Sequence, residues 1–331
     1  MSKPILILNE AEIRACVSVD KAALEAVSAG FAAIANGDVS IPPIMRIDVH
    51  ENHGEVDVKS AFVHGRDQFA IKIASGFHNN RALGLPTGSG LMVLINAVTG
   101  QPSAILLDNG YLTDVRTGIA GAIAAQHLSR TTIDTAGVIG SGMQARFQIR
   151  GLKLVRDFSK LLVFGIVPDE VEAYAQEISA ELDLEVLIMD SPEGVVRESD
   201  LVVTTTPSRE PYIQASWLHP GLHITCMGSD AEAKQEIHAD VFAHVDRIFC
   251  DKRSQVFRLG ELHHALAAGF VSDENQAVEL GEVITGQRRG RRSDDEITIC
   301  DLTGVGVQDT QIAGLAYAEA IKRGYGLEVG V

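Results

Sequence analysis

A glycine-rich turn between an apolar run and a helical segment constrains the fold of this 331-residue chain more than any other feature. The turn follows the apolar run 136–139 and reads Gly140-Ser141-Gly142-Met143-Gln144-Ala145. Gly140 allows a tight turn, Gly142 lets the backbone approach a pyrophosphate, and Ala145 permits close packing of helix on strand. Helix amides and the positive end of the helix dipole would then hold the phosphates. We predict a dinucleotide site here, and the alternative is a glycine turn that binds nothing.

The residues around this turn alternate between short apolar runs and helical patterns such as Pro168–Leu182. Alternation of this kind is typical of a parallel sheet with helices on both faces. We therefore predict an α/β fold, with a Rossmann-type doubly wound parallel sheet over residues 129–304. The predicted strands are 136–139, 161–164, 185–188, 201–205, 223–227, 247–250 and 296–300.

The region before residue 129 has a different pattern, typical of an α+β arrangement. One helix is expected to run to residue 35, with Ser18 or Asp20 as its cap, and another to run to residue 128, with Thr113 or Asp114 as its cap. The predicted strands are 45–49, 55–63, 69–75, 91–97 and 103–107, the last two forming a hairpin. We expect a final helix at about 307–323 to pack on this region, so that residues 1–128 and 305–331 form one domain.

Charge and composition exclude several classes of protein. The formal net charge of -16 disfavours binding to nucleic acid or to an anionic membrane surface. The chain has no apolar run long enough to span a membrane, and its amino terminus lacks the features of a secretory signal. The cysteines are far apart in the sequence, and we expect reduced, mostly buried thiols in a cytoplasmic enzyme: Cys16, Cys226, Cys250 and Cys300. We expect no metal site, because His263 and His264 are adjacent on a predicted helix and point in different directions.

The residues that would select between NAD and NADP are atypical. An acid that binds the ribose 2′-hydroxyl usually follows the second strand, but this chain has Gly165 and Ile166 there. The nearest carboxylate is Asp169, and the nearest cation is Arg146. We predict NAD, with NADP as the alternative.

Four cations are candidates for binding an anionic ligand. Arg116 falls in the first turn of a predicted helix, where the helix dipole disfavours a cation, so a bound anion would explain it. A solvated pair with Asp114 explains it equally well. Arg46, Lys59 and Lys72 lie in or beside strand-like runs, where lysines are more often found at an edge or on the surface.

Three aspartates are candidates for catalytic or binding carboxylates: Asp57, Asp230 and Asp309. Asp230 follows a predicted parallel strand, and ligands gather at the carboxyl ends of such strands. A helix cap is an equally good explanation of Asp230.

Taken as a set, these residues resemble the ornithine cyclodeaminase/μ-crystallin family over nearly the whole chain. The block 55–59 and the block 107–114 look closest to the subgroup encoded with ectoine-utilisation genes and to related imine reductases. The most specific stretches are 72–77, 84–87, 112–118, 138–145, 204–208 and 303–309.

The resemblance implies a homodimer, with a substrate-binding and dimerisation domain built from both chain ends. It implies that Arg46, Lys72 and Arg116 hold the substrate carboxylate, that Asp230 lies near the substrate nitrogen, and that Asp57 falls near a second acidic position. The candidate cofactor-contacting residues, beside those of the glycine turn, are Thr87, Gly165, Ile166, Thr206, Pro207, Ser208, Met227, Gly228, Thr303 and Gly304.

The leading functional hypothesis is reversible hydride transfer between NAD(P)H and an α-imino acid, which gives an α-amino acid. Neighbouring cations would lower the pKa of Lys72, so that Lys72 or Asp230 would handle the proton on nitrogen. Lys59 would fit a second substrate carboxylate, as in the reduction of iminosuccinate to aspartate. The alternatives are a cyclising ammonia-lyase that uses bound NAD catalytically and a non-catalytic binder like μ-crystallin.

Overall fold

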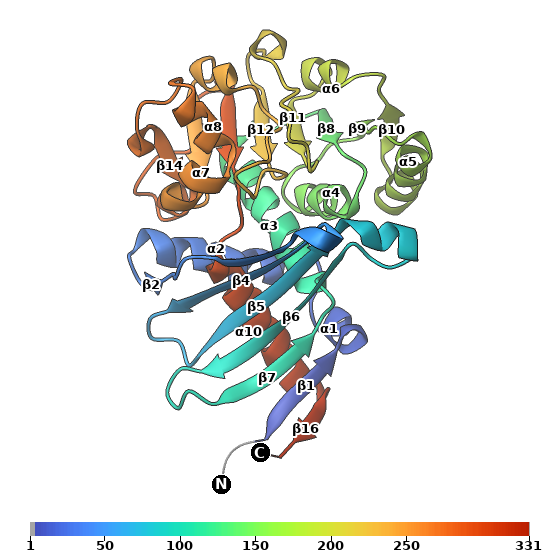
Figure 1. Cartoon of the computed structure of the whole chain (residues 1–331). Helices are drawn as coiled ribbons and strands as arrows, with labels where there is room; N and C mark the ends of the chain where they lie inside the picture. Colours follow the sequence, from blue (N-terminus) through green and yellow to red (C-terminus); the bar gives the residue numbers. More distant parts are fainter. Residues whose placement is uncertain (1–3, 331) are drawn as a thin grey trace. The chain divides into compact units, whose positions relative to one another are not determined.

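The computed structural model describes residues 4–330, and residues 1–3 and 331 at the two chain ends lie outside this range. The chain forms two compact units (Figure 1). The first comprises residues 1–116 and 305–331, and the second comprises residues 117–304. The chain passes between them inside helix α3 (Tyr111–Leu128) and again just before helix α10 (Gly306–Arg323).

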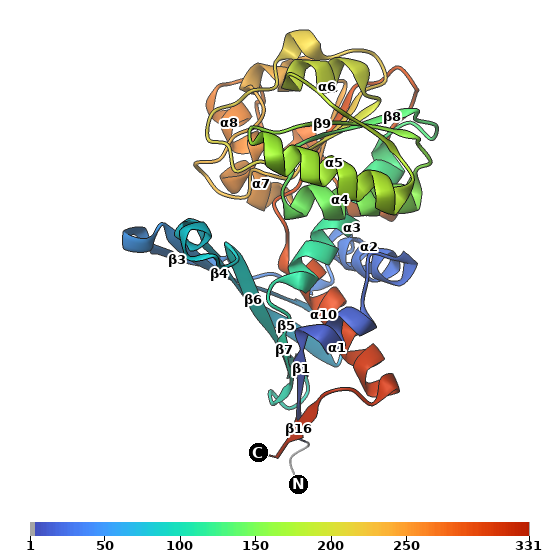
Figure 2. The same ribbon diagram turned by 90° about the vertical axis from the view of Figure 1, so that its right-hand side faces the viewer.

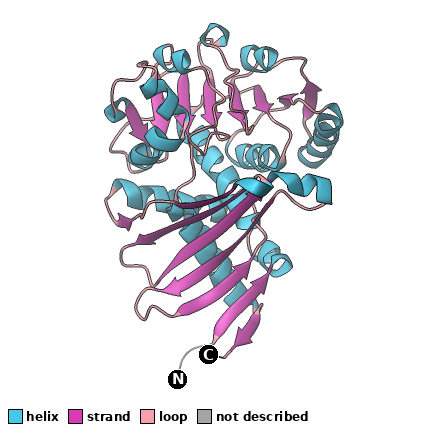
Figure 3. Cartoon of the chain, viewed as in Figure 1, coloured by secondary structure: helices cyan, strands magenta, loops and turns pink. Residues whose placement is uncertain are grey.

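The first unit is built on an eight-stranded sheet in the order β16-β1-β7-β6-β5-β4-β2, with β3 paired to β4 (Figure 3). Its predicted strands and hairpin are confirmed, whereas β1, β2 and β16 were not predicted. Helix α2 (Lys21–Ala35) is capped by Asp20, which accepts a hydrogen bond from Ala23 N. The other elements are β1 (Ile5–Asn9), α1 (Glu10–Cys16), β2 (Val39–Ser40), β3 (Met45–Val49), η1 (His50–Asn52), β4 (Gly54–Val63), β5 (Gln68–Phe77), η2 (His78–Leu83), β6 (Gly88–Asn96), β7 (Pro102–Leu107) and β16 (Leu327–Val329).

Helix α10 lies directly on one face of this sheet. Thr310 Oγ1 donates to Ala61 O at 2.7 Å and accepts from Ala70 N at 3.1 Å, which ties the helix to β4 and β5. Gly306 makes the close approach possible, because a side-chain carbon there would overlap Ser60 O. Helices α1 and α10 lie on the same side of the sheet (Figure 2). The face that points away from α10 carries partly exposed apolar side chains such as Ile73.

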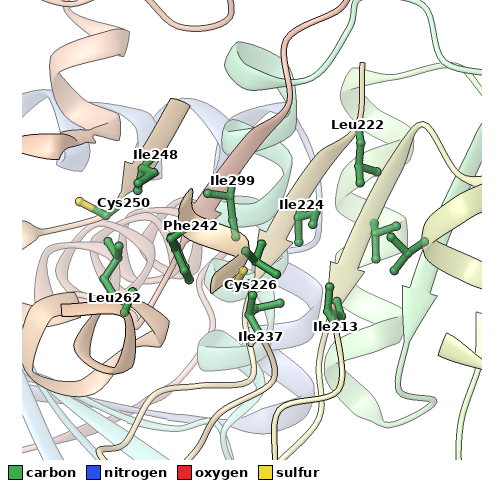
Figure 4. Packing of buried hydrophobic residues seen from close by; sticks show 14 of the residues in the cluster. Ile213, Leu222, Ile224, Cys226, Ile237, Phe242, Ile248, Cys250, Leu262 and Ile299 are labelled. Carbon is green, nitrogen blue, oxygen red and sulfur yellow. The ribbon is translucent and has the colours of Figure 1, made fainter. Parts of the chain in front are cut away.

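The second unit is an eight-stranded, fully parallel sheet in the order β10-β9-β8-β11-β12-β15-β13-β14. Successive residues of β9 face two separate cores, since Leu161 and Val163 join one cluster and Leu162 the other. Figure 4 shows part of the second cluster, around Ile224 and Ile299. The sheet is therefore covered on both faces, and the predicted α/β fold is confirmed.

The strands of the second unit lie within a residue or two of their predicted positions, except that β14 was not predicted. They are β8 (Thr135–Ile139), β9 (Lys160–Phe164), β10 (Glu185–Ile188), β11 (Leu201–Thr204), β12 (His223–Cys226), β13 (Arg247–Cys250), β14 (Ala277–Glu279) and β15 (Thr298–Asp301). The helices are α4 (Met143–Val155), α5 (Pro168–Leu182), α6 (Pro192–Glu198), α7 (Arg253–Leu259), α8 (Glu261–Ala267) and α9 (Leu280–Ile284), with 3-10 turns η3 (Ala215–Trp217), η4 (Ala239–Ala243) and η5 (Glu274–Gln276).

The predicted start of α3 is wrong. The helix begins at Tyr111, and the carboxylate of Asp108 accepts a hydrogen bond from Leu112 N at 2.8 Å. Thr113 and Asp114 therefore lie inside the helix, and Arg116 falls in its second turn. The dipole argument for an anion at Arg116 loses its force, so any such role has to rest on the surroundings of Arg116.

Two further expectations concern membranes and thiols. The helices within residues 4–330 include none that is long and apolar enough to cross a membrane. All four cysteines are buried and free: Cys16, Cys226, Cys250 and Cys300.

Candidate active site

Three buried cations in the first unit form what we call the cation cluster: Lys59 on β4, Lys72 on β5 and Arg116 on α3. Their exposed fractions are 8%, 2% and 5%. Lys59 and Lys72 are directly opposite each other in the antiparallel pair of strands. Like charges in that position repel, so the arrangement needs compensating negative charge. The general tendency of strand lysines to lie on the surface does not hold here.

Asp309 on α10 supplies part of that charge. Its Oδ1 lies 3.2 Å from Lys72 Nζ and 3.0 Å from Arg116 Nε. Burial would raise the pKa of this carboxyl, but the attraction of Lys72, Arg116 and Lys59 outweighs burial and holds the pKa below its ordinary value. Asp309 is therefore an ionised centre around which the cations are arranged.

The environment of Lys72 makes it suitable for proton transfer. Burial, followed by the charge of Arg116, lowers the pKa of Lys72 to about 7, although Asp309 acts in the opposite direction. A lysine with such a pKa can both hold and release a proton near neutral pH.

Among the buried polar atoms of residues 4–330 that have no hydrogen-bond partner are one atom of Gln308 and one of Asp309. Gln308 Oε1 accepts from Arg116 at 3.1 Å, which leaves Gln308 Nε2 as an unsatisfied donor. Asp309 Oδ2 is an unsatisfied acceptor. Buried polar atoms nearly always find a partner, so these two atoms mark a place where a ligand or water could bind.

Asp108 is a further acid that sequence reasoning missed. It is 1% exposed, and burial raises its pKa to about 6, against the opposing effect of main-chain hydrogen bonds and of Lys72. Gln308 was also missed as a site residue, although it lies within the stretch 303–309 that carried the family resemblance. The position of Asp108 just before a helix could have indicated that its carboxylate caps Leu112 N, but it gave no sign that the carboxylate is buried.

Arg46 and Asp57 pair directly across β3 and β4, on the same face of the sheet as Lys59. The guanidinium of Arg46 donates to Asp48 at 3.0 Å and to Glu55, and it lies 3.6 Å from Asp57 Oδ2. Partial burial acts to lower the pKa of Arg46, but the three carboxylates raise it. Arg46 thus has neutralising partners of its own.

The glycine turn of the second unit fits a dinucleotide pyrophosphate. Gly140 has a φ of 108°, and a side-chain carbon there would overlap Thr205 Oγ1. Gly142 has open space where its side chain would be, and it precedes α4 without a side-chain cap. The first-turn amides of α4 therefore lack a side-chain cap and are available to phosphate oxygens.

The atypical position after β9 has a packing explanation. A side-chain carbon on Gly165 would lie 2.7 Å from Val171 Cγ2, so an acid does not fit there. Ile166 is 90% exposed. Arg146 is held by Glu177 at 2.7 Å and by Ser141 O at 2.6 Å.

Several predicted cofactor-contacting residues lie on loops at one edge of the parallel sheet. Because β11, β12 and β15 are adjacent and parallel, the loops that follow them meet at that edge. These loops carry Thr206, Pro207 and Ser208 after β11, Met227 and Gly228 after β12, and Thr303 and Gly304 after β15. Thr87 lies in the first unit, just before β6.

Asp230 follows β12 on the loop that begins with Met227. Its carboxylate pairs with Lys234 Nζ at 2.6 Å and is about half exposed. The residues that follow it do not form a helix until η4, so the capping explanation fails. His263 and His264 lie on α8, and within residues 4–330 no group of three or more metal-ligating side chains could hold a metal ion.

The chain is similar in sequence to known proteins. Residues 4–324 match the ornithine cyclodeaminase/mu-crystallin family. The chain is 46% identical over 321 residues to an uncharacterized cyclodeaminase of Sinorhizobium fredii, with 97% of both proteins covered. It is 33% identical over 331 residues to the iminosuccinate reductase of Paracoccus denitrificans, with 99% of this chain and 100% of the relative covered.

Solved structures agree over almost the whole chain. The Δ1-pyrroline-2-carboxylate reductase of Thermococcus litoralis, in complex with NADH and L-proline, has a TM-score of 0.93 at 28% identity, covering 98% of this chain and 100% of the other. The Paracoccus denitrificans iminosuccinate reductase with NAD+ has a TM-score of 0.91 at 31% identity, covering 99% and 100%. An archaeal alanine dehydrogenase dimer with bound NAD has a TM-score of 0.90 at 31% identity, covering 98% and 99%.

Proposed function

Because the chain belongs to the ornithine cyclodeaminase/mu-crystallin family, we propose that it catalyses NAD(H)-dependent reduction of an α-imino acid to an α-amino acid. The observation that carries this proposal is the cation cluster, in which Lys59, Lys72 and Arg116 are buried around Asp309. Buried cations in excess of ionised carboxylates are costly unless a ligand brings negative charge. A substrate carboxylate would provide it.

The substrate carboxylate would bind to Arg116 and to Gln308 Nε2. Arg116 is held in place by Asp309 and Gln308, so its guanidinium is already oriented before a ligand arrives. Lys59 would receive a second carboxylate, which makes a dicarboxylic imine such as iminosuccinate the leading candidate. The relative named iminosuccinate reductase, similar over the full chain, supports that choice.

Lys72 would hold the proton that is transferred to the substrate nitrogen. Its pKa of about 7 suits both directions of the reaction, and Asp309 fixes the position of its Nζ. When bound, the nicotinamide supplies or accepts the hydride. Asp230, which is held by Lys234, would lie near the substrate nitrogen as a second proton-handling group. Arg46 and Asp57, which lie on the same face of the sheet as Lys59, would line the substrate site.

The cofactor would be NAD rather than NADP. The cation expected nearest to the residues after β9, Arg146, is already held by Glu177 and by Ser141 O, so it is not available to the 2′-phosphate of NADP. The solved relatives with NAD or NADH support this choice. The residues that would contact NAD are those of the glycine turn and the loop residues predicted from the sequence.

The enzyme would act as a homodimer. The sheet face opposite α10 exposes apolar side chains, among them Ile73 at 37% and Leu107 at 46%, and a second copy of this face would cover them. The dimeric archaeal relative supports this assembly. Light scattering on the purified protein measures the assembly, and a monomer at micromolar concentration would refute it.

The enzyme would act in the cytoplasm, since its four buried free thiols are compatible with a reducing compartment.

A cyclising ammonia-lyase is the second candidate. Asp230 is the acid that such an enzyme would place near the substrate nitrogen, and a relative named as a cyclodeaminase is 46% identical. A non-catalytic binder like μ-crystallin is disfavoured. The buried Lys72 has a pKa of about 7, which suits proton transfer, and a protein that only binds its ligand does not require a lysine with such a pKa.

One assay series separates these functions. The protein is incubated with NADH, ammonia and a panel of keto acids that includes oxaloacetate, and separately with ornithine and trace NAD. We expect stoichiometric loss of NADH with oxaloacetate and ammonia. Proline formation without net change in NAD would overturn the reductase and support the lyase. Binding of NADH without turnover in either assay would support the binder.

A further inference from the structure

A second group of buried acidic side chains lies in the second unit and includes Glu236, Glu261 and Asp301. Glu236 is 0% exposed and lies on the loop between β12 and η4. Five donors surround its carboxylate, and they come from the segments that follow β11 and β12 as well as from the end of β11. This carboxylate has no part in the chemistry proposed above.

Each oxygen of the Glu236 carboxylate accepts one hydrogen bond from a main-chain amide. Oε1 accepts from Thr206 N at 2.7 Å, and Oε2 accepts from Gly228 N at 2.9 Å. Hydroxyl groups complete the shell, since Thr206 Oγ1 and Tyr212 OH donate to Oε1 and Thr204 Oγ1 donates to Oε2. Each oxygen therefore anchors the main chain of a different loop.

Glu236 is itself held in place by further buried acids. Glu261 on α8 accepts from Glu236 N at 2.7 Å and from Ile237 N at 3.2 Å. Asp301, at the end of β15, accepts from Leu262 N at 2.9 Å and so fixes the start of α8. The chain of contacts runs from Asp301 through α8 to Glu236 and ends at the loops after β11 and β12.

We propose that Glu236 is a positioning residue whose carboxylate fixes the loops carrying Thr206 and Gly228 in the conformation that binds the nicotinamide half of the dinucleotide. This inference rests on the proposed NAD site, because Thr206 and Gly228 lie at the carboxyl ends of the strands where such ligands bind. Gly228 packs so closely that a side-chain carbon on it would overlap both Thr206 O and Glu236 Oε2. The two loops and the carboxylate therefore form one tightly packed assembly.

The near-isosteric change Glu236→Gln tests this arrangement sharply. A glutamine offers one oxygen and one NH2 group, so in either orientation the amide of Thr206 or of Gly228 faces another donor. One loop must then move. We expect the Kd for NADH, measured by fluorescence titration, to rise about 10- to 100-fold, as for a buried main-chain donor left without its acceptor.

Two further variants calibrate that result. Tyr212→Phe removes one hydroxyl donor and leaves both main-chain bonds to Glu236, so we expect about a threefold rise in Kd, typical of one neutral hydrogen bond. Asp200→Asn is the matched control at the amino-terminal ends of the strands, because Asp200 directly precedes β11. Asp200 Oδ2 accepts from Asp134 N at 2.7 Å and from Thr135 N at 3.1 Å, and an asparagine oxygen can replace it, whereas the ion pair between Asp200 Oδ1 and Arg130 is lost. The Kd for NADH of this control should equal that of the wild type.

Hydrogen–deuterium exchange separates positioning from general destabilisation. In Glu236→Gln, the amides of residues 204–208 and 226–230 should exchange faster, whereas those of 135–139 should not. Unchanged NADH affinity in Glu236→Gln, or unchanged exchange at these loops, would refute the proposal. So would a Kd that simply follows the melting temperature across all variants. If Glu236→Gln does not fold, Tyr212→Phe carries the test, and a wild-type Kd there refutes it. Failure of the wild-type protein to bind NADH would instead refute the proposed function.

Discussion

The cation cluster of the first unit and the carboxylate of Glu236 in the second unit are both buried, but their hydrogen-bonding groups are satisfied in different ways. In the first unit, Lys72 and Arg116 share one oxygen of Asp309, and buried atoms of Asp309 and Gln308 are left without partners. In the second unit, the carboxylate of Glu236 receives five hydrogen bonds, two of them from main-chain amides.

The difference separates a site that receives a ligand from a scaffold that shapes one. Buried cations beside an unsatisfied donor such as Gln308 Nε2 can gain from an incoming anion. Charges saturated by main-chain amides gain nothing from a ligand, but they fix loops. We therefore expect changes in the cation cluster to alter substrate turnover, and changes in the second unit to alter cofactor affinity and stability.

The largest effect is expected at Lys72. Lys72→Met should lower kcat by about a thousandfold, as for loss of a general acid, and leave the Kd for NADH within twofold of the wild type. In the wild type, kcat/KM for imine reduction should fall as pH rises above about 7, because the proton on Lys72 is lost there. Steady-state kinetics and NADH fluorescence measure both effects.

Lys72→Arg is the matched variant for this prediction. It keeps the positive charge, but a guanidinium does not release a proton near neutral pH, so turnover should not recover. Near-wild-type kcat in Lys72→Arg would mean that Lys72 acts only through its charge.

The next largest effect is expected at Arg116. Arg116→Ala should lower kcat/KM by about 100-fold, mainly through a higher KM, because a charge-assisted hydrogen bond to the substrate carboxylate is lost. NADH affinity should not change. Arg14→Ala, which removes an exposed pair with Glu10 in the same unit, is the control and should leave the kinetics intact. A collapse of NADH binding in Arg116→Ala would contradict the carboxylate role.

A smaller effect is expected at the glycine turn. Gly142→Ala places its side chain in open space, so the melting temperature should not change, yet the Kd for NADH should rise about tenfold, since about 1.4 kcal/mol is lost where the pyrophosphate approaches. Gly140→Ala should instead lower the melting temperature, because of its φ of 108° and the overlap with Thr205. Unchanged NADH affinity in Gly142→Ala would move the pyrophosphate away from this turn.

The smallest effect is expected in the pH dependence of stability at Asp301. Burial raises the pKa of Asp301 from 3.8 to about 8. The folded state then binds a proton that the unfolded state has released, so stability falls as pH rises from about 4 to about 8. We expect the melting temperature of the wild type to fall by about 5 °C between pH 6 and pH 8. Asp301→Asn, whose oxygen can still accept from Leu262 N, should flatten this slope, and an identical slope would contradict the assignment.

Local signals in the sequence located most of the fold. Helix α2 is capped by Asp20, one of the two expected caps, and ends at residue 35 as predicted, and β3, β10 and β13 have their predicted ends. The strands β1, β2, β14 and β16 were missed because each is short and depends on distant partners, such as Leu6 with Glu328. The start of α3 was misplaced because two good capping residues follow the true one, Asp108.

The site residues were recovered unevenly for a similar reason. Lys72, Arg116 and Asp309 stood out as charges in apolar or helical segments, and the structure brings all three together. Gln308 and Asp108 were missed, since a polar side chain near the start of a helix gives no sign of being buried. The position of Arg46 among three carboxylates depends on strand register, which the sequence pattern left open.

The sequence by itself determined the strand, glycine turn and helix at residues 135–155 and the alternation of strands and helices around them, because backbone freedom and hydrophobic periodicity are local properties. Only the tertiary structure decided which charges meet. Arg116 and Asp309 are 193 residues apart in the chain, and Lys72 acquires a pKa of about 7 only when folding buries it beside Arg116. Desolvation and Coulomb interactions depend on what surrounds a group in space, so the chemistry of this site was fixed by packing.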